Sequence, residues 1–291
     1  MTEQDHHTTD QDPSPLFPKR RGCAWLMFAI MVIISAVWGA CLGAFVFVLD
    51  DAQTTVRVVE DFRPKIGSKV YSADGELLGE FTTEARQVVS LSEMPLHLQK
   101  AFIAEEDATF YSHKGVRPLA ILSAIRDMLV SGRVRGASTI TQQLARNIEG
   151  TGVSRAQTYQ RKIKEAIVAL QLERQFTKDE ILELYLNQSF LGVSAHGVEA
   201  AAQQYFGKSC RDLTLAESAT LAGLTPAPNS YQPFRYPERA KRRRDIVLKQ
   251  ILENAFITQA EYDAAIAESL DDSVITPEER LAREQNGEEF W

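Results

Sequence analysis

The stretch from Glu105 to Gly115, EEDATFYSHKG, places acids, aromatics and a histidine close enough together to do chemistry. On a continuous helix Glu106, Phe110 and His113 stand at intervals of four and three residues, so they would share one face. With Phe110 in the core, Glu106 would be partly desolvated, and burial raises the pKa of a carboxylate. A general base needs such a group, because it must accept a proton near neutral pH. The alternative is a run of surface acids beside a structural histidine. Spacing alone favours that alternative, because charged runs are common on helices.

A second stretch, Arg135 to Asn147 (RGASTITQQLARN), crowds short polar side chains against a glycine turn. These side chains are Ser138, Thr139, Thr141, Gln142 and Gln143. A helix that begins there offers free N–H groups, which attract anions, and Arg146 adds a positive charge farther along. The alternative is an ordinary N-cap followed by an exposed polar helix face.

A third stretch, Tyr159 to Phe176 (YQRKIKEAIVALQLERQF), sets two cations one helical turn before an acid. Arg161 and Lys162 precede Glu165 by four and three residues, the spacing of neighbours on a helix surface. One interpretation is a carboxylate held among cations that grip phosphate. The other is a surface ion pair, worth a few tenths of a kcal/mol. Taken alone, this stretch favours the surface ion pair.

An uncharged segment from Gly22 to Leu49 is long enough, as a helix, to cross a hydrocarbon core of roughly 30 Å. Lys19, Arg20 and Arg21 precede it, so the positive-inside rule places the N-terminus in the cytoplasm and the rest of the chain outside. The alternative is a buried core helix. We therefore expect a cytoplasmic tail (1–21), a transmembrane helix (22–49), a stalk (50–68), a folded domain (69–270) and a C-terminal tail (271–291).

Composition excludes several classes of protein and site. The formal net charge of −7 over 291 residues argues against a general nucleic-acid binder. Of the three cysteines, only Cys210 follows the apolar segment, so the exported part has no intramolecular disulfide. No CxxC pattern points to a bound metal. The folded domain must therefore be held together by its core.

The pattern of apolar residues predicts a mainly helical domain after a small β-hairpin. The hairpin is expected within Lys69 to Val89, around an Asp74-Gly75 turn. Apolar residues then recur at three- and four-residue spacing. The predicted helices are 96–110, 119–130, 139–148, 162–176, 178–188, 197–206, 215–224, 238–255 and 261–270.

Five stretches in this order resemble the motifs of the peptidoglycan glycosyltransferase domain, glycosyltransferase family 51. They read EDATFYSHKG, RGASTITQQLARN, RKIKEAIVALQLER, EILELYLNQSFLGVSAHGVEAAAQQYFGK and LTLAESATLAGLTPAPNSYQP. This domain occurs in class A penicillin-binding proteins and in monofunctional transglycosylases. The resemblance covers Lys69 to Leu270 and implies a lysozyme-like, two-lobed helical fold.

The family polymerises lipid II into β-1,4-linked glycan strands, with inversion and release of undecaprenyl pyrophosphate. By resemblance, Glu106 is the general base that deprotonates the 4-hydroxyl of the incoming GlcNAc, and Asp107 follows it as in the family. Glu165 matches a second carboxylate that orients cations or helps the pyrophosphate leave. The implied substrate-binding residues are Asp107, Ser138, Thr139, Gln142, Gln143, Arg146, Arg161, Lys162 and Asn187.

The chain departs from the family pattern at three positions. Arg146 stands where lysine is usual, which keeps the charge but changes its shape. Ser194 stands where glycine is common, and His196 where tyrosine is common, and both departures concern contacts on the acceptor side. The stretch Val116 to Val134 mixes apolar residues with arginines and predicts a membrane-dipping lobe; an amphipathic core helix is the alternative.

The resemblance also sets expectations about what surrounds the transferase. The penicillin-binding transpeptidase signatures S-x-x-K, S-x-N and K-T-G do not occur as an ordered set, so we expect no peptide cross-linking by this chain. The implied location is the bacterial inner membrane, single-pass, with the catalytic domain in the periplasm. The implied partners are lipid II, the growing glycan strand, membrane lipid and other cell-wall synthesis proteins.

No motif specifies a metal, although pyrophosphate chemistry is compatible with Mg2+ or another divalent cation. Two rival functions remain open. One is a lysozyme-type lytic enzyme, which also uses a glutamate near glycan but needs no cations that grip phosphate. The other is a non-catalytic membrane scaffold for cell-wall synthases.

Overall fold

The computed structural model describes residues 25–40, 42–43, 68–72, 74, 77–81, 88–117, 138–148, 159–276, 278–279 and 282. The chain divides into two compact units, Met1–Asp50 and Asp51–Trp291. The predicted helix at 119–130 and most of the predicted membrane-dipping lobe lie outside the described residues.

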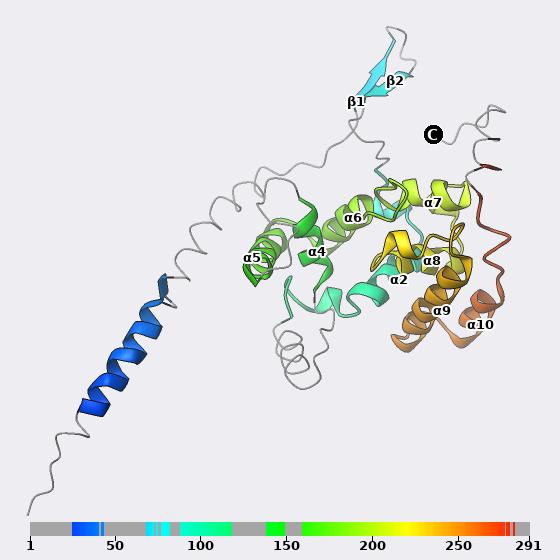
Figure 1. The fold of residues 1–291 in the computed structure, drawn as a ribbon. Helices are drawn as coiled ribbons and strands as arrows, with labels where there is room; N and C mark the ends of the chain where they lie inside the picture. The colour runs from blue at the N-terminus through cyan, green and yellow to red at the C-terminus, as the bar shows by residue number, and fades with distance from the viewer. Residues whose placement is uncertain are drawn as a thin grey trace, which may run out of the picture. The chain divides into compact units, whose positions relative to one another are not determined.

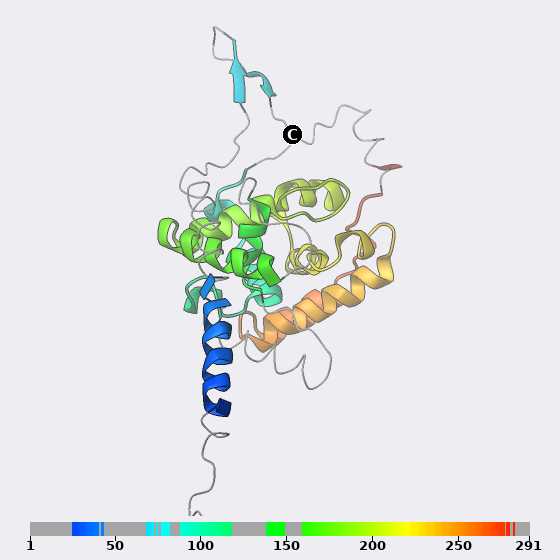
Figure 2. The ribbon, with the colours of Figure 1, turned by 60° about the vertical axis from the view of Figure 1, so that its left-hand side comes forward.

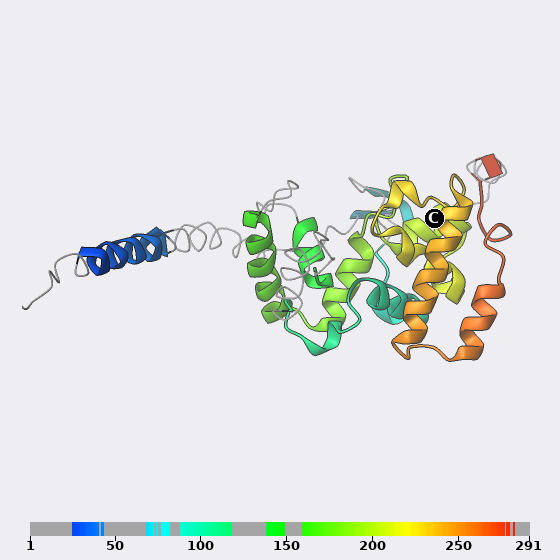
Figure 3. The same cartoon turned by 60° about the horizontal axis from the view of Figure 1, so that its bottom comes forward.

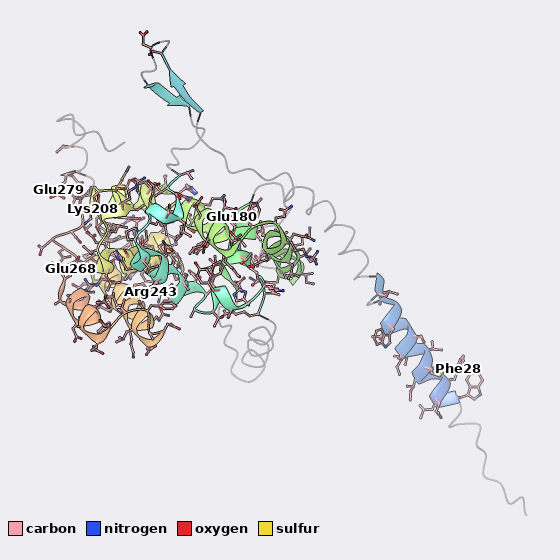
Figure 4. All side chains as sticks on the ribbon, turned by 180° about the vertical axis from the view of Figure 1, so that it is seen from behind. Phe28, Glu180, Lys208, Arg243, Glu268 and Glu279 are labelled. Atoms are coloured by element: carbon pink, nitrogen blue, oxygen red, sulfur yellow. The ribbon has the colours of Figure 1, made fainter. Side chains whose placement is uncertain are left out.

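In the first unit, residues 25–40 form a helix whose side chains are all exposed. Trp25 and Trp38 are each 72% exposed, and Figure 4 shows Phe28 pointing away from the helix axis. Among the helices that the structure describes, none is both long enough and apolar enough to cross a membrane. Both ends of the predicted span, residues 22–24 and 44–49, lie outside the described part of the chain.

The second unit is mainly helical, as its apolar spacing predicts, and Figure 1 shows the order of its elements. Its strands are β1 (Ser68–Tyr71) and β2 (Leu77–Phe81), which pair antiparallel with an irregularity between Val70 and Tyr71. Its α-helices are α2 (Leu96–Glu106), α4 (Ile140–Asn147), α5 (Tyr159–Gln175), α6 (Lys178–Gln188), α7 (Val198–Phe206), α8 (Leu215–Leu224), α9 (Pro237–Glu253) and α10 (Gln259–Ala267).

Four of these helices begin with a capping box. A threonine at the N-cap accepts a hydrogen bond from the backbone three residues on, and a Glu or Gln side chain there bonds back to the threonine backbone. The pairs are Thr139 with Gln142, Thr177 with Glu180, Thr214 with Glu217 and Thr258 with Glu261. This reciprocal bonding fixes the starts of α4, α6, α8 and α10 independently of their packing.

Helix packing places α2 between two groups of helices. It packs on α8 and α9, while α4 packs on α5 and α6 (Figure 1). The side chains of Phe102 on α2 and Tyr185 on α6 meet edge to face with ring centroids 6.4 Å apart, and both are buried. The core is thus continuous from α2 to α6. Because α4 packs on α6, the C-terminal end of α2 also lies close to α4.

The expected helix over 96–110 is wrong at its C-terminal end. Helix α2 ends at Glu106, because Asp107 leaves the helical conformation with φ −161° and ψ 71°. Phe110 is buried, but it lies in a separate 3-10 turn, Phe110–Ser112. Glu106, Phe110 and His113 therefore do not share one helix face. The physical reason is that the Asp107 side chain turns inward to bond other elements, as described below.

Gly197 explains how α7 starts against α6. Its φ of +89° is one that side-chain-bearing residues rarely adopt. A Cβ added there would lie 2.6 Å from the carbonyl oxygen of Asn187. Glycine at this position therefore allows two backbones to touch and orients the chain that leads into α7.

Arg244 on α9 closes the end of α10, which lies alongside α9 in Figures 2 and 3. Its side chain is fully buried, and its guanidinium donates to the carbonyl oxygens of Glu268 at 2.7 Å and Ile266 at 3.4 Å. Its Nε also donates to Asp245 at 2.9 Å. A cation at a helix C-terminus satisfies carbonyls that lack partners within the helix, so α10 ends here rather than at Leu270.

We expect Arg244→Met to lower the free energy of unfolding by about 2–4 kcal/mol, because partly buried carbonyls lose a charged donor. Urea denaturation of the full chain in detergent measures the change. Lys249→Met is the matched control, since Lys249 lies on the same helix but is 67% exposed and pairs with the exposed Glu253. Equal stability of the two variants would contradict this role for Arg244.

Candidate active site

The three consecutive acids at the end of α2 each have their own partners. Glu105 forms an ion pair with Arg243 of α9. Glu106 accepts hydrogen bonds from Gln143 of α4 and from Thr225, just after α8. Asp107 is only 1% exposed and bonds at the start of α4. The surface-charge interpretation of this run is therefore wrong, because each acid has an internal partner.

Asp107 is the anion that lies at the start of α4. Its Oδ2 accepts a hydrogen bond from the backbone N–H of Ile140 at 3.2 Å and lies 2.8 Å from Nε2 of His113. Its Oδ1 lies 3.6 Å from Arg117. A negative group is stabilised at a helix N-terminus. The anion expected there is thus supplied by the chain itself, and His113 has the structural role that the sequence suggested.

The Glu106 carboxylate is held by one fixed donor and one hydroxyl. Nε2 of Gln143 donates to Oε2 at 2.5 Å, and Oγ1 of Thr225 contacts Oε1. The hydroxyl of Tyr185 donates to the Oε1 of Gln143 at 3.3 Å, which turns the amide nitrogen of Gln143 toward Glu106. Burial, with the nearby charge of Glu106, raises the pKa of Tyr185 well above its usual value, so this phenol stays a donor.

Glu165 is the centre of a cation cluster. Its carboxylate is completely buried, with Nε of Arg146 at 3.0 Å, Nε of Arg161 at 3.1 Å and Nζ of Lys162 at 2.6 Å. Lys162 also donates to Oγ of Ser138 at 2.7 Å, which ties α5 to the start of α4. Three cations around one carboxylate leave two positive charges. This is not the surface ion pair that the stretch alone favoured.

Two of the three cations are accessible to an approaching anion, whereas Arg161 is only 11% exposed and the carboxylate is buried. The side chains of Lys162 and Arg146 are 44% and 34% exposed, whereas Glu165 is 0% exposed. A buried charge needs partners, so Glu165 holds the three cations in place from beneath. The arrangement presents positive charge to solvent at a fixed position, which suits a phosphate-bearing ligand.

Helix α4 connects the two carboxylates. Gln143, which contacts Glu106, and Arg146, which contacts Glu165, are three residues apart. Side chains at this spacing lie on one helix face, about 4.5 Å apart along the axis. Glu106 and the cation cluster therefore lie along the same side of α4.

The remaining predicted site residues are engaged inside the protein. Thr139 and Gln142 form the capping box of α4, and the Thr139 hydroxyl also donates to the carbonyl of Gly115 at 2.5 Å. The amide of Asn187 bonds the backbone N–H and carbonyl of Val89 at 3.0 and 2.9 Å. Thr139, Gln142 and Asn187 are all at least 94% buried. The buried Thr139, Gln142 and Asn187 therefore have structural contacts. The other predicted residues form the site itself: Glu106, Gln143, Ser138, Arg146, Arg161, Lys162 and Glu165.

Sequence reasoning missed Thr225, Arg243 and Tyr185. Tyr185 and Thr225 lie within quoted motifs, YLN and LAGLTPAP, but no residue-level signal linked them to Glu106. Arg243 is one of three consecutive arginines on α9. The structure shows that Arg243 is partly buried whereas Arg242 is exposed. Figure 4 labels Arg243, which ion-pairs with Glu105 of α2.

Ser194 and His196, which depart from the expected pattern, line an open cavity of about 580 Å3. The ring of His196 lies 5.1 Å from that of Phe190, and Phe234 and Arg235 also line the cavity. Ser194 has φ +63°, a conformation that favours glycine, the residue that is common there in the pattern.

Within the described residues, no group of three or more His, Cys, Asp and Glu side chains could hold a metal ion.

A carboxylate held by hydrogen-bond donors, beside a cation cluster on the same helix face, is suited to an enzyme that transfers a group from a phosphate-bearing donor. The chain belongs to the transglycosylase family, whose model matches residues 74–252, more than half of its length.

Two curated relatives are similar over most of this chain. Penicillin-binding protein 1A of Aquifex aeolicus is 44% identical over 84% of this chain and 33% of the relative. Penicillin-binding protein 1A of Escherichia coli is 42% identical over 87% of this chain and 29% of the relative. The chain thus spans about a third of the length of these relatives. A crystal structure of penicillin-binding protein 1A from Haemophilus influenzae is 29% identical, covers 72% of this chain and 21% of that one, and has a TM-score of 0.38, too low to bear on the fold.

Glu105 gives a prediction about pH and stability. Burial raises its pKa from the ordinary 4.5 to about 7, against the attraction of Arg243 and with the repulsion of Glu106. Because the folded form binds this proton more tightly than the unfolded form, the contribution to stability is complete below about pH 4.5 and is lost as the pH rises to 7.

We expect the stability of the parent, relative to Glu105→Gln, to fall by about 1–3 kcal/mol between pH 4.5 and 8. Urea denaturation of the full chain across this range measures the difference. Glu253→Gln, at an exposed site on α9, should follow the parent at every pH. A constant difference between the parent and Glu105→Gln would show that this carboxyl does not titrate in that range.

Proposed function

We propose that this chain is a membrane-anchored peptidoglycan glycosyltransferase that polymerises lipid II into β-1,4-linked glycan strands with inversion, releasing undecaprenyl pyrophosphate. The proposal is supported by membership of the transglycosylase family and by the relatives named penicillin-binding protein 1A. The observation that carries it is the Glu165 cluster, with three cations on one buried carboxylate.

Glu106 acts as the general base in this proposal. It takes the proton of the GlcNAc 4-hydroxyl as that oxygen forms a bond to the anomeric carbon of the growing chain. Gln143 donates to Oε2 of Glu106 and so orients the carboxylate before the substrate arrives. The expelled oxygen belongs to the lipid pyrophosphate, and the electron pair of the broken bond goes to it.

Arg146, Arg161 and Lys162 receive the charge that develops on the pyrophosphate. Donors that are already in place stabilise such charge without reorganising during the reaction. Glu165 keeps the three cations at fixed distances, so its role is to position them. Gln143 and Ser138 line the same side, and Ser138 holds the ammonium group of Lys162 at 2.7 Å.

Asp107, Thr139, Gln142 and Asn187 have a supporting role. Their polar atoms bond the protein's own backbone and side chains, so they hold α2, α4 and α6 in register beneath the reacting groups. If the fold carries a divalent cation such as Mg2+, it would assist the leaving charge together with the substrate's own phosphate oxygens.

The catalytic domain in this proposal covers residues 69–270 in a lysozyme-like arrangement. The apolar segment 22–49 anchors it in the inner membrane, with the domain in the periplasm and the N-terminus in the cytoplasm. Exposed aromatic and aliphatic side chains along the helix at 25–40 support this anchoring. Lipid II, the growing glycan and membrane lipid are then the partners. The rival lytic enzyme has no use for the cations at Glu165.

The test is to incubate the full chain in detergent with labelled lipid II and to measure glycan polymer. We expect polymer from the parent, and a loss of at least about 100-fold for Glu106→Gln, because the amide cannot accept the proton. Glu253→Gln, a matched change on the exposed face of α9, should behave as the parent. Circular dichroism confirms that each variant is folded.

Two results would contradict the proposal. Polymer from Glu106→Gln at the parent rate would remove Glu106 from the chemistry. No polymer from the folded parent, or shortening of an added glycan strand, would favour the scaffold or the lytic enzyme.

A further inference from the structure

We propose that Thr225 is a positioning residue for Glu106 that supports its carboxyl group in both protonation states. This inference rests on the proposed function, because it concerns how the proposed base is held. Thr225 lies at the C-cap of α8, next to Pro226, which prevents the helix from continuing.

The hydroxyl of Thr225 has two alternative hydrogen-bond partners. Its Oγ1 contacts Oε1 of Glu106 and also lies 2.9 Å from the carbonyl oxygen of Ala222. A hydroxyl carries one proton and two lone pairs, so it can donate to only one of these oxygens at a time. The two contacts therefore describe two orientations of one O–H group.

Each orientation suits one state of Glu106. When the carboxylate is ionised, Thr225 donates its proton to Oε1. When Glu106 has taken a proton, its own O–H donates to Oγ1, and the Thr225 proton turns to the Ala222 carbonyl. Neither state leaves a partly buried polar atom unpaired, which would otherwise destabilise that state.

Gln143 cannot do the same. Its Nε2 is a donor only, and the Tyr185 hydroxyl on its Oε1 holds the amide in that orientation. A donor to the ionised form favours that form alone. Glu106 thus has one partner that keeps it ready to accept a proton and a second that remains a partner after the proton has arrived.

Arg243 fixes the position of Thr225 relative to Glu106. Its Nε donates to the carbonyl of Gly223 at 3.3 Å, and its Nη2 pairs with Glu105. A Cβ at Gly223 would lie 2.9 Å from Cγ of Arg243, so glycine allows this close passage. Arg243 therefore links the end of α8 to the end of α2. Its partner on α8, Gly223, is two residues before Thr225, and its partner on α2, Glu105, is one residue before Glu106.

The test compares Thr225→Val, which keeps the shape and loses the hydroxyl, with Thr225→Ser, which keeps the hydroxyl. Polymer formation from lipid II by the full chain in detergent gives kcat and KM from pH 5 to 9. In the described part of the chain, the other titratable or polar groups near Glu106 are Glu105 beside it, Gln143 from α4 and Tyr185 from α6, with Arg243 acting through Glu105. None of them is changed by either substitution.

We expect Thr225→Val to lower kcat by about 10-fold or more with KM within about 2-fold of the parent. The position of its kcat profile along the pH axis should stay that of the parent, because the lost hydroxyl serves both protonation states of Glu106 alike. Thr225→Ser should keep the parent profile and at least about a third of kcat. If Val matches the parent in kcat, if Val moves the profile along the pH axis, or if Ser loses as much as Val, the inference is overturned.

Thermal unfolding provides a second readout that does not depend on activity. We expect Thr225→Val to unfold about 2–4 °C below Thr225→Ser at both pH 4 and pH 8, since the hydroxyl serves both states. Equal midpoints at either pH overturn the inference. A parent that makes no polymer contradicts the proposed function instead, and the unfolding comparison still decides the role of Thr225.

Discussion

The geometry of this site depends on the hydrogen bond between the Asp107 carboxylate and the backbone N–H of Ile140. A buried acid requires donors, and the start of α4 supplies one together with a favourable dipole. To reach it, Asp107 must leave the helical conformation, and α2 ends one residue earlier. Glu106 is then the last helical residue and faces α4 and α8, while Glu105 faces α9. Three adjacent acids thus end up with three separate sets of partners.

A second constraint is charge balance around Glu165. A completely buried carboxylate is costly unless it is paired, and three cations from α4 and α5 pair with it. The cluster has a net positive charge, and its Arg146 and Lys162 side chains are partly exposed whereas its carboxylate is not. Because Gln143 and Arg146 stand one turn apart on α4, a small movement of that helix would alter both centres together. The same helix therefore coordinates proton acceptance and binding of the leaving group in the proposed reaction.

The sequence predicted most of the helices but not how their ends meet. Helices α6 and α8 have the predicted bounds, because apolar spacing and capping threonines are local signals. The end of α2 was wrong, since it is determined by a hydrogen bond to a residue 33 positions away. Glu106, Glu165 and the cations could be named from motifs, and the structure brings them together.

Thr225 and Arg243 could not be predicted from the sequence. Their importance comes from contacts of high sequence separation, 119 residues for Thr225 to Glu106 and 138 for Arg243 to Glu105. No local pattern encodes such contacts.

The central claim is that proton acceptance and pyrophosphate binding belong to two separate centres, at Glu106 and around Glu165. The most direct measurement is the affinity of the full chain in detergent for undecaprenyl pyrophosphate, in Glu106→Gln and in Lys162→Met. The account predicts parent affinity for Glu106→Gln and a loss of about 10-fold or more for Lys162→Met, because a charge-assisted contact to phosphate is removed. Equal weakening by both substitutions, or none by Lys162→Met, would contradict the division between the two centres.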